Sequence, residues 1–138
     1  MRFVLDASVA VKWVLPEPDS QKALSLRSDL QTQVHEFIAP DTFPVEVAHA
    51  LTRVERRGTL QQQEAVLKLA DVLGTALQFV PYFLLLTRAV ELSSRHRIGV
   101  YDCLYLALAD QEQCALVTAD QRLKAVGHPR VMLLMDYQ

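Results

Sequence analysis

Four acidic residues lie at points of the chain where charge is unexpected. Asp6 closes an apolar run at the start of the sequence, and Asp120 follows a second apolar run near its end. Asp102 enters a third apolar stretch, whereas Glu46 opens a predicted helix. Carboxylates that a fold gathers in a buried place need a counter-charge, and a divalent cation can supply it. This set of residues therefore favours metal-assisted chemistry on a phosphate.

The length and composition predict one domain over residues 1–138. A chain of this length buries roughly two-thirds of its unfolded surface. Hydrophobic residues make up 51% and charged ones 22%, with four glycines and six prolines, which excludes a disordered or low-complexity chain. The apolar stretches 79–86 and 101–109 are shorter than the ~18 residues of a membrane span, and the N-terminus leaves no room for a signal peptide. We therefore expect a cytoplasmic protein without membrane attachment.

The cysteines and histidines argue against a disulfide and against zinc. Cys103 and Cys114 lie in or beside one predicted helix, whose rise separates them by ~16 Å. The sequence has no C-x-x-C pair and no H-E-x-x-H motif, and its four histidines are scattered. Any metal should therefore be bound by oxygen atoms.

The net charge of −2 comes from 16 acidic and 14 basic residues. If the four selected acids bind cations, twelve acids remain against fourteen bases, which leaves about +2 for the rest of the surface. This balance permits binding of a phosphate backbone without demonstrating it. Basic residues are candidates for such contacts, and none is favoured individually. They are Lys12, Arg53, Arg56, Arg57, Arg95, Arg97, Arg122 and Lys124.

Short apolar strands alternate with amphipathic helices along the chain. The predicted strands are 3–5, 37–39, 77–80, 115–117 and a possible fifth at 131–134. The predicted helices are 9–15, 19–33, 42–57, 61–73, 82–96, 100–113 and 120–126. Ser8, Asp19 and Thr42 are candidate N-caps. This order predicts a single-domain α/β fold, with a parallel sheet of four to five strands flanked by about seven helices.

Two of the predicted helices carry specific expectations about packing. Helix 100–113 is apolar almost all round and should lie in the core. Helix 61–73 should direct Val66, Leu69, Ala70 and Leu73 inward. Trp13 and Tyr105 lie in apolar helices, which favours core packing over stacking on a nucleic-acid base.

Ligands of parallel α/β sheets gather beyond the carboxyl ends of the strands. Asp6 and Asp120 both follow predicted strands and would flank one crevice, which Glu46 and Asp102 could reach from the first turns of their helices. Taken singly, each acid can also be explained without a metal site. A loop or helix cap explains Asp6 and Asp120, the helix dipole explains Asp102, and a solvated helix face explains Glu46. The hypothesis therefore depends on all four together.

The segments around these acids resemble the four acidic motifs of PIN-domain ribonucleases, most closely those of the VapC toxin group. The resemblance covers essentially the whole chain in order. Its segments are Val4-Leu5-Asp6-Ala7-Ser8-Val9, Pro44-Val45-Glu46-Val47-Ala48, Tyr101-Asp102-Cys103-Leu104-Tyr105-Leu106-Ala107-Leu108-Ala109 and Leu116-Val117-Thr118-Ala119-Asp120. Cys103 stands where the family frequently has alanine, a small change.

The resemblance implies a PIN-like fold and a Mg²⁺- or Mn²⁺-dependent endoribonuclease, the toxin of a toxin-antitoxin pair. The metal would be held by Asp6, Glu46, Asp102 and Asp120. Hydroxyl residues that match Ser8 and Thr118 line the site in the family. Family members commonly form homodimers and are inhibited by a small DNA-binding antitoxin.

The predicted reaction is hydrolysis of an RNA phosphodiester without a covalent enzyme intermediate. Asp6, Asp102 and Asp120 would be metal ligands, and Glu46 would act as a ligand or as the base. Ser8 and Thr118 would orient ligands or water, or would be simple helix-cap and strand-end hydroxyls.

Two other classes of function stay open at this point. A receiver-like phosphoacceptor domain also has an acidic pocket at the top of a parallel sheet, but Asp6 is not one of a pair, and the segment Thr118-Ala119-Asp120 supplies no lysine that matches that family's. A catalytically silent binding module could use the acids to receive an arginine of a partner. Uptake of Mg²⁺ or Mn²⁺ would separate the silent module from the nuclease.

Overall fold

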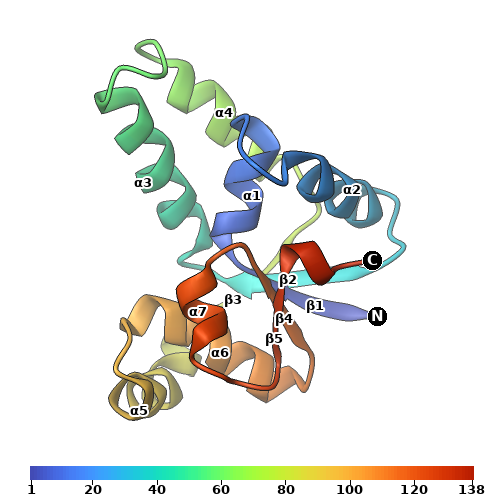
Figure 1. Cartoon of the computed structure of the whole chain (residues 1–138), viewed down its shortest axis with the longest axis vertical. Coiled ribbons are helices and arrows are strands. Elements are labelled where there is room, and N and C mark those ends of the chain that lie inside the picture. The colour runs from blue at the N-terminus through green and yellow to red at the C-terminus, as the bar shows by residue number, and fades with distance from the viewer.

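A five-stranded parallel sheet forms the centre of the computed structural model, which describes residues 1–138. The strands follow the spatial order β3-β2-β1-β4-β5 (Figure 1). Their bounds are Arg2–Leu5 (β1), Glu36–Pro40 (β2), Gln78–Val80 (β3), Ala115–Thr118 (β4) and Val131–Leu133 (β5). All neighbouring strands run parallel. The predicted α/β fold class is confirmed, including the fifth strand.

Strand β1 lies in the middle of the sheet and pairs with strands from both halves of the chain. Val4 is in register with Ile38 of β2 on one side and with Leu116 of β4 on the other. Val4 and Leu5 are fully buried. A central parallel strand is covered on both faces, which explains why the first residues of the chain form a continuous apolar run.

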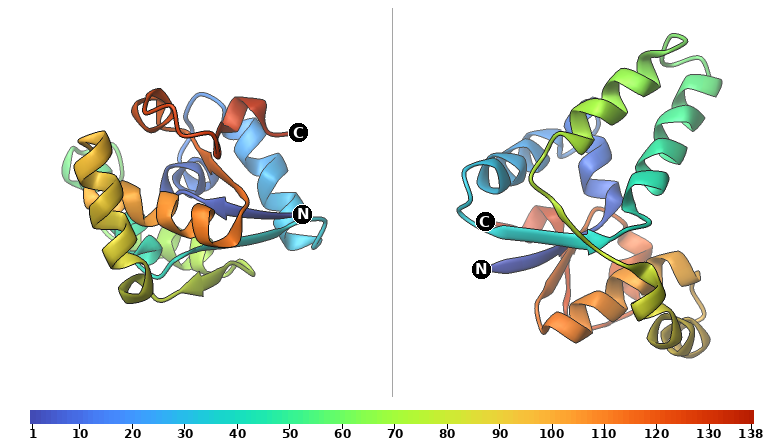
Figure 2. Two further views of the ribbon diagram at one scale, coloured as in Figure 1. Left: turned by 90° about the horizontal axis from the view of Figure 1, so that it is seen from below. Right: turned by 180° about the vertical axis from the view of Figure 1, so that it is seen from behind.

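Helices cover both faces of this sheet, as the two views of Figure 2 show. Helices α1 to α4 lie on one side, and α5 and α6 lie on the other (Figure 2). The α-helices are Ala7–Val14 (α1), Ser20–Gln31 (α2), Phe43–Arg56 (α3), Glu64–Leu73 (α4), Leu86–His96 (α5), Val100–Glu112 (α6) and Gln121–Ala125 (α7). Two short 3₁₀ helices complete the fold, Tyr82–Leu85 (η1) and Leu134–Asp136 (η2). None of the helices combines the length and apolarity needed to cross a bilayer.

Helix α6 is the principal core helix, as its sequence predicts. Every residue from Cys103 to Ala109 is buried, and the helix packs against β1, β2 and β4. Cys103 and Cys114 are both free thiols. Trp13 is also buried, and its indole N–H donates a hydrogen bond of 2.9 Å to the carbonyl of Ala23.

Helix α4 differs from the prediction in its buried face and its start. It begins at Glu64, and its buried residues are Ala65 and Val72. Val66 and Leu73 are 69% and 43% exposed, and Ala70 is exposed as well. Helices α3 and α4 form a hairpin that extends away from the sheet (Figure 1). Because α4 packs mainly against α1 and α3 there, it buries a narrow stripe and leaves apolar residues in solvent.

The N-cap predictions also need correction. Asp6 occupies the N-cap position of α1, so Ser8 lies inside the first turn. Asp19 and Thr42 stand at the N-cap positions of α2 and α3, but neither side chain makes a capping hydrogen bond. Thr42 donates to Glu46 instead. The hydroxyls of Ser8 and Thr42 therefore donate hydrogen bonds to the carboxylates of Asp6 and Glu46 and do not cap helices.

Candidate active site

The carboxyl ends of β1 and β4 carry two of the predicted acids side by side. Leu5 and Val117 are paired residues of these neighbouring strands, and the backbone N–H of Asp6 donates to the carbonyl of Val117 at 3.0 Å. Asp120 follows β4 as the N-cap of α7. The predicted crevice between the two strand ends therefore exists.

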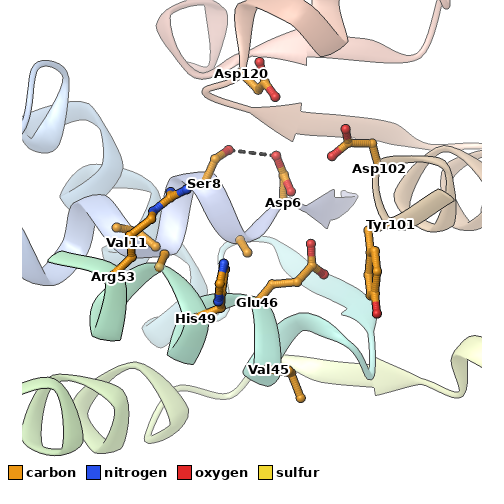
Figure 3. A pocket seen from close by; sticks show the side chains of 12 residues that line it. Asp6, Ser8, Val11, Val45, Glu46, His49, Arg53, Tyr101, Asp102 and Asp120 are labelled. Atoms are coloured by element: carbon orange, nitrogen blue, oxygen red, sulfur yellow. Dashed lines mark hydrogen bonds between the residues drawn. The ribbon is translucent and has the colours of Figure 1, made fainter. Parts of the chain in front are cut away.

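All four predicted acids line one pocket of about 610 Å³ at this end of the sheet. Figure 3 shows them projecting from four different segments of the chain. Asp6 lies at the end of β1, Glu46 in the first turn of α3, Asp102 in the first turn of α6, and Asp120 before α7. The fold thus brings together residues that lie far apart in the sequence.

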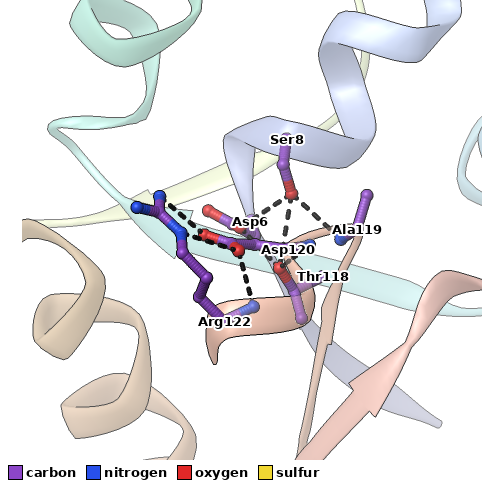
Figure 4. Close-up of polar contacts among 6 residues, drawn as sticks. All are labelled: Asp6, Ser8, Thr118, Ala119, Asp120 and Arg122. Carbon is purple, nitrogen blue, oxygen red and sulfur yellow. Dashed lines mark hydrogen bonds and ion pairs between the residues drawn. The ribbon is translucent and has the colours of Figure 1, made fainter. Parts of the chain in front are cut away.

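Asp6 is the most deeply buried of these acids, with 5% of its surface exposed. The hydroxyls of Ser8 and Thr118 each donate a hydrogen bond of 2.7 Å to the same oxygen, Asp6 Oδ2 (Figure 4). The other oxygen, Oδ1, accepts no hydrogen bond from the protein. The carboxylate is therefore held in one orientation and keeps one oxygen available for a ligand.

The same two hydroxyls also fix the turn that leads to Asp120. Ser8 Oγ accepts a hydrogen bond of 3.0 Å from the backbone N–H of Ala119, and Thr118 Oγ1 accepts one of 3.0 Å from that of Asp120. Both hydroxyls contact the acidic site directly. These contacts tie the start of α1 to the end of β4 (Figure 4).

Glu46 is oriented by two hydroxyls on a different side of the pocket. Tyr105 donates a hydrogen bond of 2.8 Å to Glu46 Oε2, and Thr42 donates one of 3.2 Å to the same oxygen. Tyr105 is fully buried in α6. Sequence reasoning assigned it to the core and missed its polar end. Its position three residues after Asp102, on the same helix face, was the available signal.

Asp120 is the acid with a positively charged neighbour. Its Oδ1 accepts the backbone N–H of Arg122 at 2.9 Å, and the Arg122 guanidinium lies 3.5 Å from the carboxylate. The Arg122 side chain is 90% exposed, so this ion pair is weak. Asp6, Glu46 and Asp102 have no ion pair with a basic side chain.

Three of the acids are held in an environment that disfavours their charge. Burial raises the pKa of Asp6 to about 6, against the opposing hydrogen bonds of Thr118 and Ser8. Burial also raises the pKa of Glu46 to about 7, with a further contribution from the charge of Asp6. The pKa of Asp102 is raised by burial and then by the charge of Asp120. No basic side chain forms an ion pair with any of these three acids, so their charge is not neutralised within the protein.

The rest of the pocket lining comes mainly from α1, α3 and α6. His49 and Arg53 extend the α3 face that begins at Glu46, and Tyr101 precedes Asp102 on α6. Of the eight basic candidates, Arg53 lines the pocket and Arg122 contacts Asp120. Tyr101 was not predicted as a site residue, because one exposed tyrosine at a helix start has no distinguishing sequence signal.

The chemistry of this donor set fits a hard divalent cation. Carboxylate oxygens are preferred by Mg²⁺ and Mn²⁺, and Asp6 keeps one carboxylate oxygen, Oδ1, without a hydrogen bond from the protein, since Ser8 and Thr118 both donate to Oδ2. No three His, Cys, Asp or Glu side chains already stand around a common ion position. No lysine lines the pocket, so the lysine of a receiver-like phosphoacceptor is absent from its lining.

Comparisons with known proteins agree on one family. The model of the PIN domain matches residues 3–129. Ribonuclease VapC3 of Pyrobaculum aerophilum is 34% identical over 125 residues, which cover 89% of this chain and 92% of that protein. Among solved structures, the Mycobacterium tuberculosis toxin VapC20, described as cleaving the sarcin-ricin loop, has a TM-score of 0.68 at 18% identity, and the match covers 94% of this chain and 98% of that one.

A further solved structure includes a partner. It is VapBC2 of Rickettsia felis bound to a DNA fragment from its promoter. Its matching chain has a TM-score of 0.67 at 18% identity, covering 96% of this chain and 97% of that one. At this level of identity, the likeness to the two solved structures supports the fold alone.

Proposed function

The chain belongs to the PIN-domain family and, within it, to the VapC ribonucleases, and we propose on this basis that its acidic pocket hydrolyses RNA phosphodiesters with Mg²⁺ or Mn²⁺. The observation that carries the proposal is the convergence of Asp6, Glu46, Asp102 and Asp120 on one pocket, in which only Asp120 forms an ion pair with a basic side chain.

The three aspartates are the proposed holders of the cation. Asp6 offers its free Oδ1, while Ser8 and Thr118 keep Oδ2 in place. Asp102 and Asp120 approach from the α6 and β4 sides of the pocket (Figure 3). When bound, a divalent cation supplies Lewis-acid stabilisation of the charge that develops on a reacting phosphate.

Glu46 is the proposed acceptor of the proton from the attacking water. Water attacks phosphorus in line with the 3′-oxygen, the bond from phosphorus to that oxygen breaks, and the 3′-oxygen takes a proton from solvent. The hydrogen bonds from Tyr105 and Thr42 to Oε2 leave Glu46 Oε1 without a protein partner, so Oε1 is the oxygen placed to orient the water. Ser8 and Thr118 position Asp6 and do not contact the phosphate.

The biological setting follows from the VapC relatives as part of the same proposal. We expect the chain to act in the cytoplasm as a toxin, to form a homodimer, and to be inhibited by a small DNA-binding antitoxin encoded beside it. The complex of VapBC2 with promoter DNA is a precedent for such a partner in another organism.

The experiment that tests the proposal is incubation of the purified chain with total cellular RNA in Mn²⁺ or Mg²⁺, followed by mapping of the cut ends. Discrete cuts that leave 5′-phosphate and 3′-hydroxyl ends, and that stop when a chelator is added, are the expected result. Ends that carry 2′,3′-cyclic phosphates, or cuts that persist in chelator, would contradict it. A chain that neither takes up Mn²⁺ nor cuts RNA, but binds a basic peptide tightly, would support the silent binding module.

A further inference from the structure

We infer that the pocket binds single-stranded RNA through two subsites on either side of the acids: Arg53 contacts a backbone phosphate at one end, and Tyr101 stacks on a base at the other. This inference deepens the proposed ribonuclease function and rests on it. Neither residue belongs to the acidic set, and both line the same pocket.

Arg53 lies on the α3 face that Glu46 begins, with His49 between them. Arg53 follows Glu46 by seven positions on the helix, which corresponds to about 10.5 Å along the helix axis. Arg53 is exposed and makes no side-chain hydrogen bond or ion pair, whereas Arg2 and Arg27 are both paired with acids. A free guanidinium at the rim of a pocket for phosphate chemistry is suited to the oxygens of a neighbouring phosphate.

Tyr101 is a large aromatic side chain that the fold leaves 59% exposed at the pocket. It lies in the first turn of α6, directly before Asp102, and its hydroxyl makes no hydrogen bond within the protein. Residues 103–109 of α6 are buried core, so the ring stands on a rigid support. A fixed aromatic ring beside a site for RNA cleavage offers a surface on which an unpaired base can stack.

Figure 3 shows the relative positions of these side chains. Tyr101 lies on one side of Glu46, and His49 and Arg53 lie on the other. An RNA strand that contacts both subsites therefore passes Glu46, with the three aspartates along one side, which places the scissile phosphate beside the acids. A base within a duplex is already stacked on its neighbours and cannot cover the ring of Tyr101. The ligand class is therefore a single strand or a loop with an unstacked base.

Binding of a short, unstructured, fluorescently labelled RNA tests the two subsites separately. Fluorescence anisotropy in saturating Mn²⁺ measures affinity without cleavage when Glu46→Gln, which removes the proposed proton acceptor, is present in every chain compared, the otherwise unmodified one included. We expect Tyr101→Ala to weaken binding by about 5- to 100-fold, whereas Tyr101→Phe keeps the ring and the affinity. We expect Arg53→Ala to reduce the slope of log affinity against log salt by about 0.7, the value for one phosphate contact to a single strand, whereas Arg53→Lys keeps the slope. Tyr101→Ala should leave the slope unchanged.

Exposed residues outside the pocket provide matched controls. Tyr82 is 43% exposed in η1, and Arg95 is an exposed, unpaired arginine of α5. Tyr82→Ala and Arg95→Ala should bind RNA like the unmodified chain. Four results would each overturn the inference. The control variants could lose as much affinity as the pocket variants, or Arg53→Ala could leave the salt slope unchanged. The unmodified chain could fail to bind RNA, or duplex RNA could compete as strongly as a single strand.

Cleavage assays separate this inference from the proposed function. Removing either subsite should raise KM for a short RNA substrate with little change in kcat, because the contact is made equally in the ground and transition states. Mn²⁺ uptake, measured by calorimetry, should be the same in Tyr101→Ala, Tyr101→Phe, Arg53→Ala and Arg53→Lys as in the unmodified chain. If the unmodified chain cuts RNA and the variants cut it with unchanged KM, the subsites are wrong and the ribonuclease stands.

Discussion

The hydroxyl of Tyr105 and the carboxylate of Glu46 meet at 2.8 Å across an interval of 59 residues. Tyr105 is buried in the core helix α6, and Glu46 lies at the beginning of α3. The core of the protein therefore sets the orientation of a side chain in the pocket. Packing of α6 therefore affects the orientation of Glu46 as well as the position of Asp102, which α6 itself carries.

We predict that Tyr105→Phe lowers kcat for RNA cleavage by about 10- to 100-fold, the range for losing a hydrogen bond to a charged group. KM should change little, because Tyr105 does not contact RNA. The matched control is Tyr137→Phe, which removes a buried hydroxyl that donates to Asp29 at 2.6 Å away from the pocket. Equal effects of the two substitutions on kcat would show that Tyr105 acts only through stability.

Asp6→Asn should abolish cleavage while leaving the fold intact. The amide oxygen can still accept the hydrogen bonds of Ser8 and Thr118, but the negative charge that faces the cation is lost. Calorimetry should detect weaker Mn²⁺ uptake, and thermal unfolding at pH 8 without metal should show a higher Tm than that of the unmodified chain. Asp71→Asn, at an exposed residue paired with Arg27, is the control. Undiminished metal-dependent cleavage by Asp6→Asn would refute the role assigned to Asp6.

The stability of the metal-free protein should depend on pH through Asp6. Its pKa is raised from 3.8 to about 6 by burial, so between these values the folded chain keeps a proton that the unfolded chain has lost. Stability therefore falls as pH rises from about 4 to about 6 and stays lower above that range. The contribution of this group is about 3 kcal/mol, and that of Glu46 has the same sign.

Denaturant unfolding at pH 5 and pH 8 in chelator measures this effect. The unmodified chain should be more stable at pH 5, and the difference should shrink in Asp6→Asn. Saturating Mn²⁺ should raise stability at pH 8, because an ion that binds only the folded state stabilises it. Higher stability at pH 8 than at pH 5 in chelator would contradict the pKa assignment of Asp6.

Thr118→Val tests whether the hydroxyls around Asp6 contribute to metal binding. The substitution keeps the shape of a fully buried side chain and removes the donor to Asp6 Oδ2 and the acceptor for the Asp120 N–H. We predict that Mn²⁺ affinity falls by roughly 10- to 100-fold. Thr75→Val is the control, since its hydroxyl donates only to the carbonyl of Val72. If both variants bind Mn²⁺ like the unmodified chain, Thr118 has only a structural role.

Much of the fold and the acidic set could be predicted because strong local patterns determine them. A buried strand precedes Asp6 and another precedes Asp120, so any parallel α/β arrangement places both acids at the carboxyl end of the sheet. The motifs around them agree with the PIN-domain family that the comparisons confirm. Helix α6 is apolar almost all round and can only be core. These predictions needed no knowledge of how the helices pack.

The errors and omissions concern contacts between distant segments. The inward face of α4 depends on how far the α3–α4 hairpin extends from the sheet, which its own sequence does not specify. Ser8 fits the pattern of an N-cap, but its hydroxyl binds Asp6 because β4 brings Thr118 and Ala119 alongside. Tyr105 reads as a core residue because only its terminal oxygen reaches the pocket.

The parallel pairing of β1 with β4 also determines when the chain can become active during synthesis. Asp6 is translated near the beginning, but its hydrogen-bond partner Thr118 follows 112 residues later. A ribosome-bound nascent chain that lacks β4 has neither the neighbouring strand nor Asp120. The acidic pocket can therefore be complete only after nearly the whole chain has been synthesised.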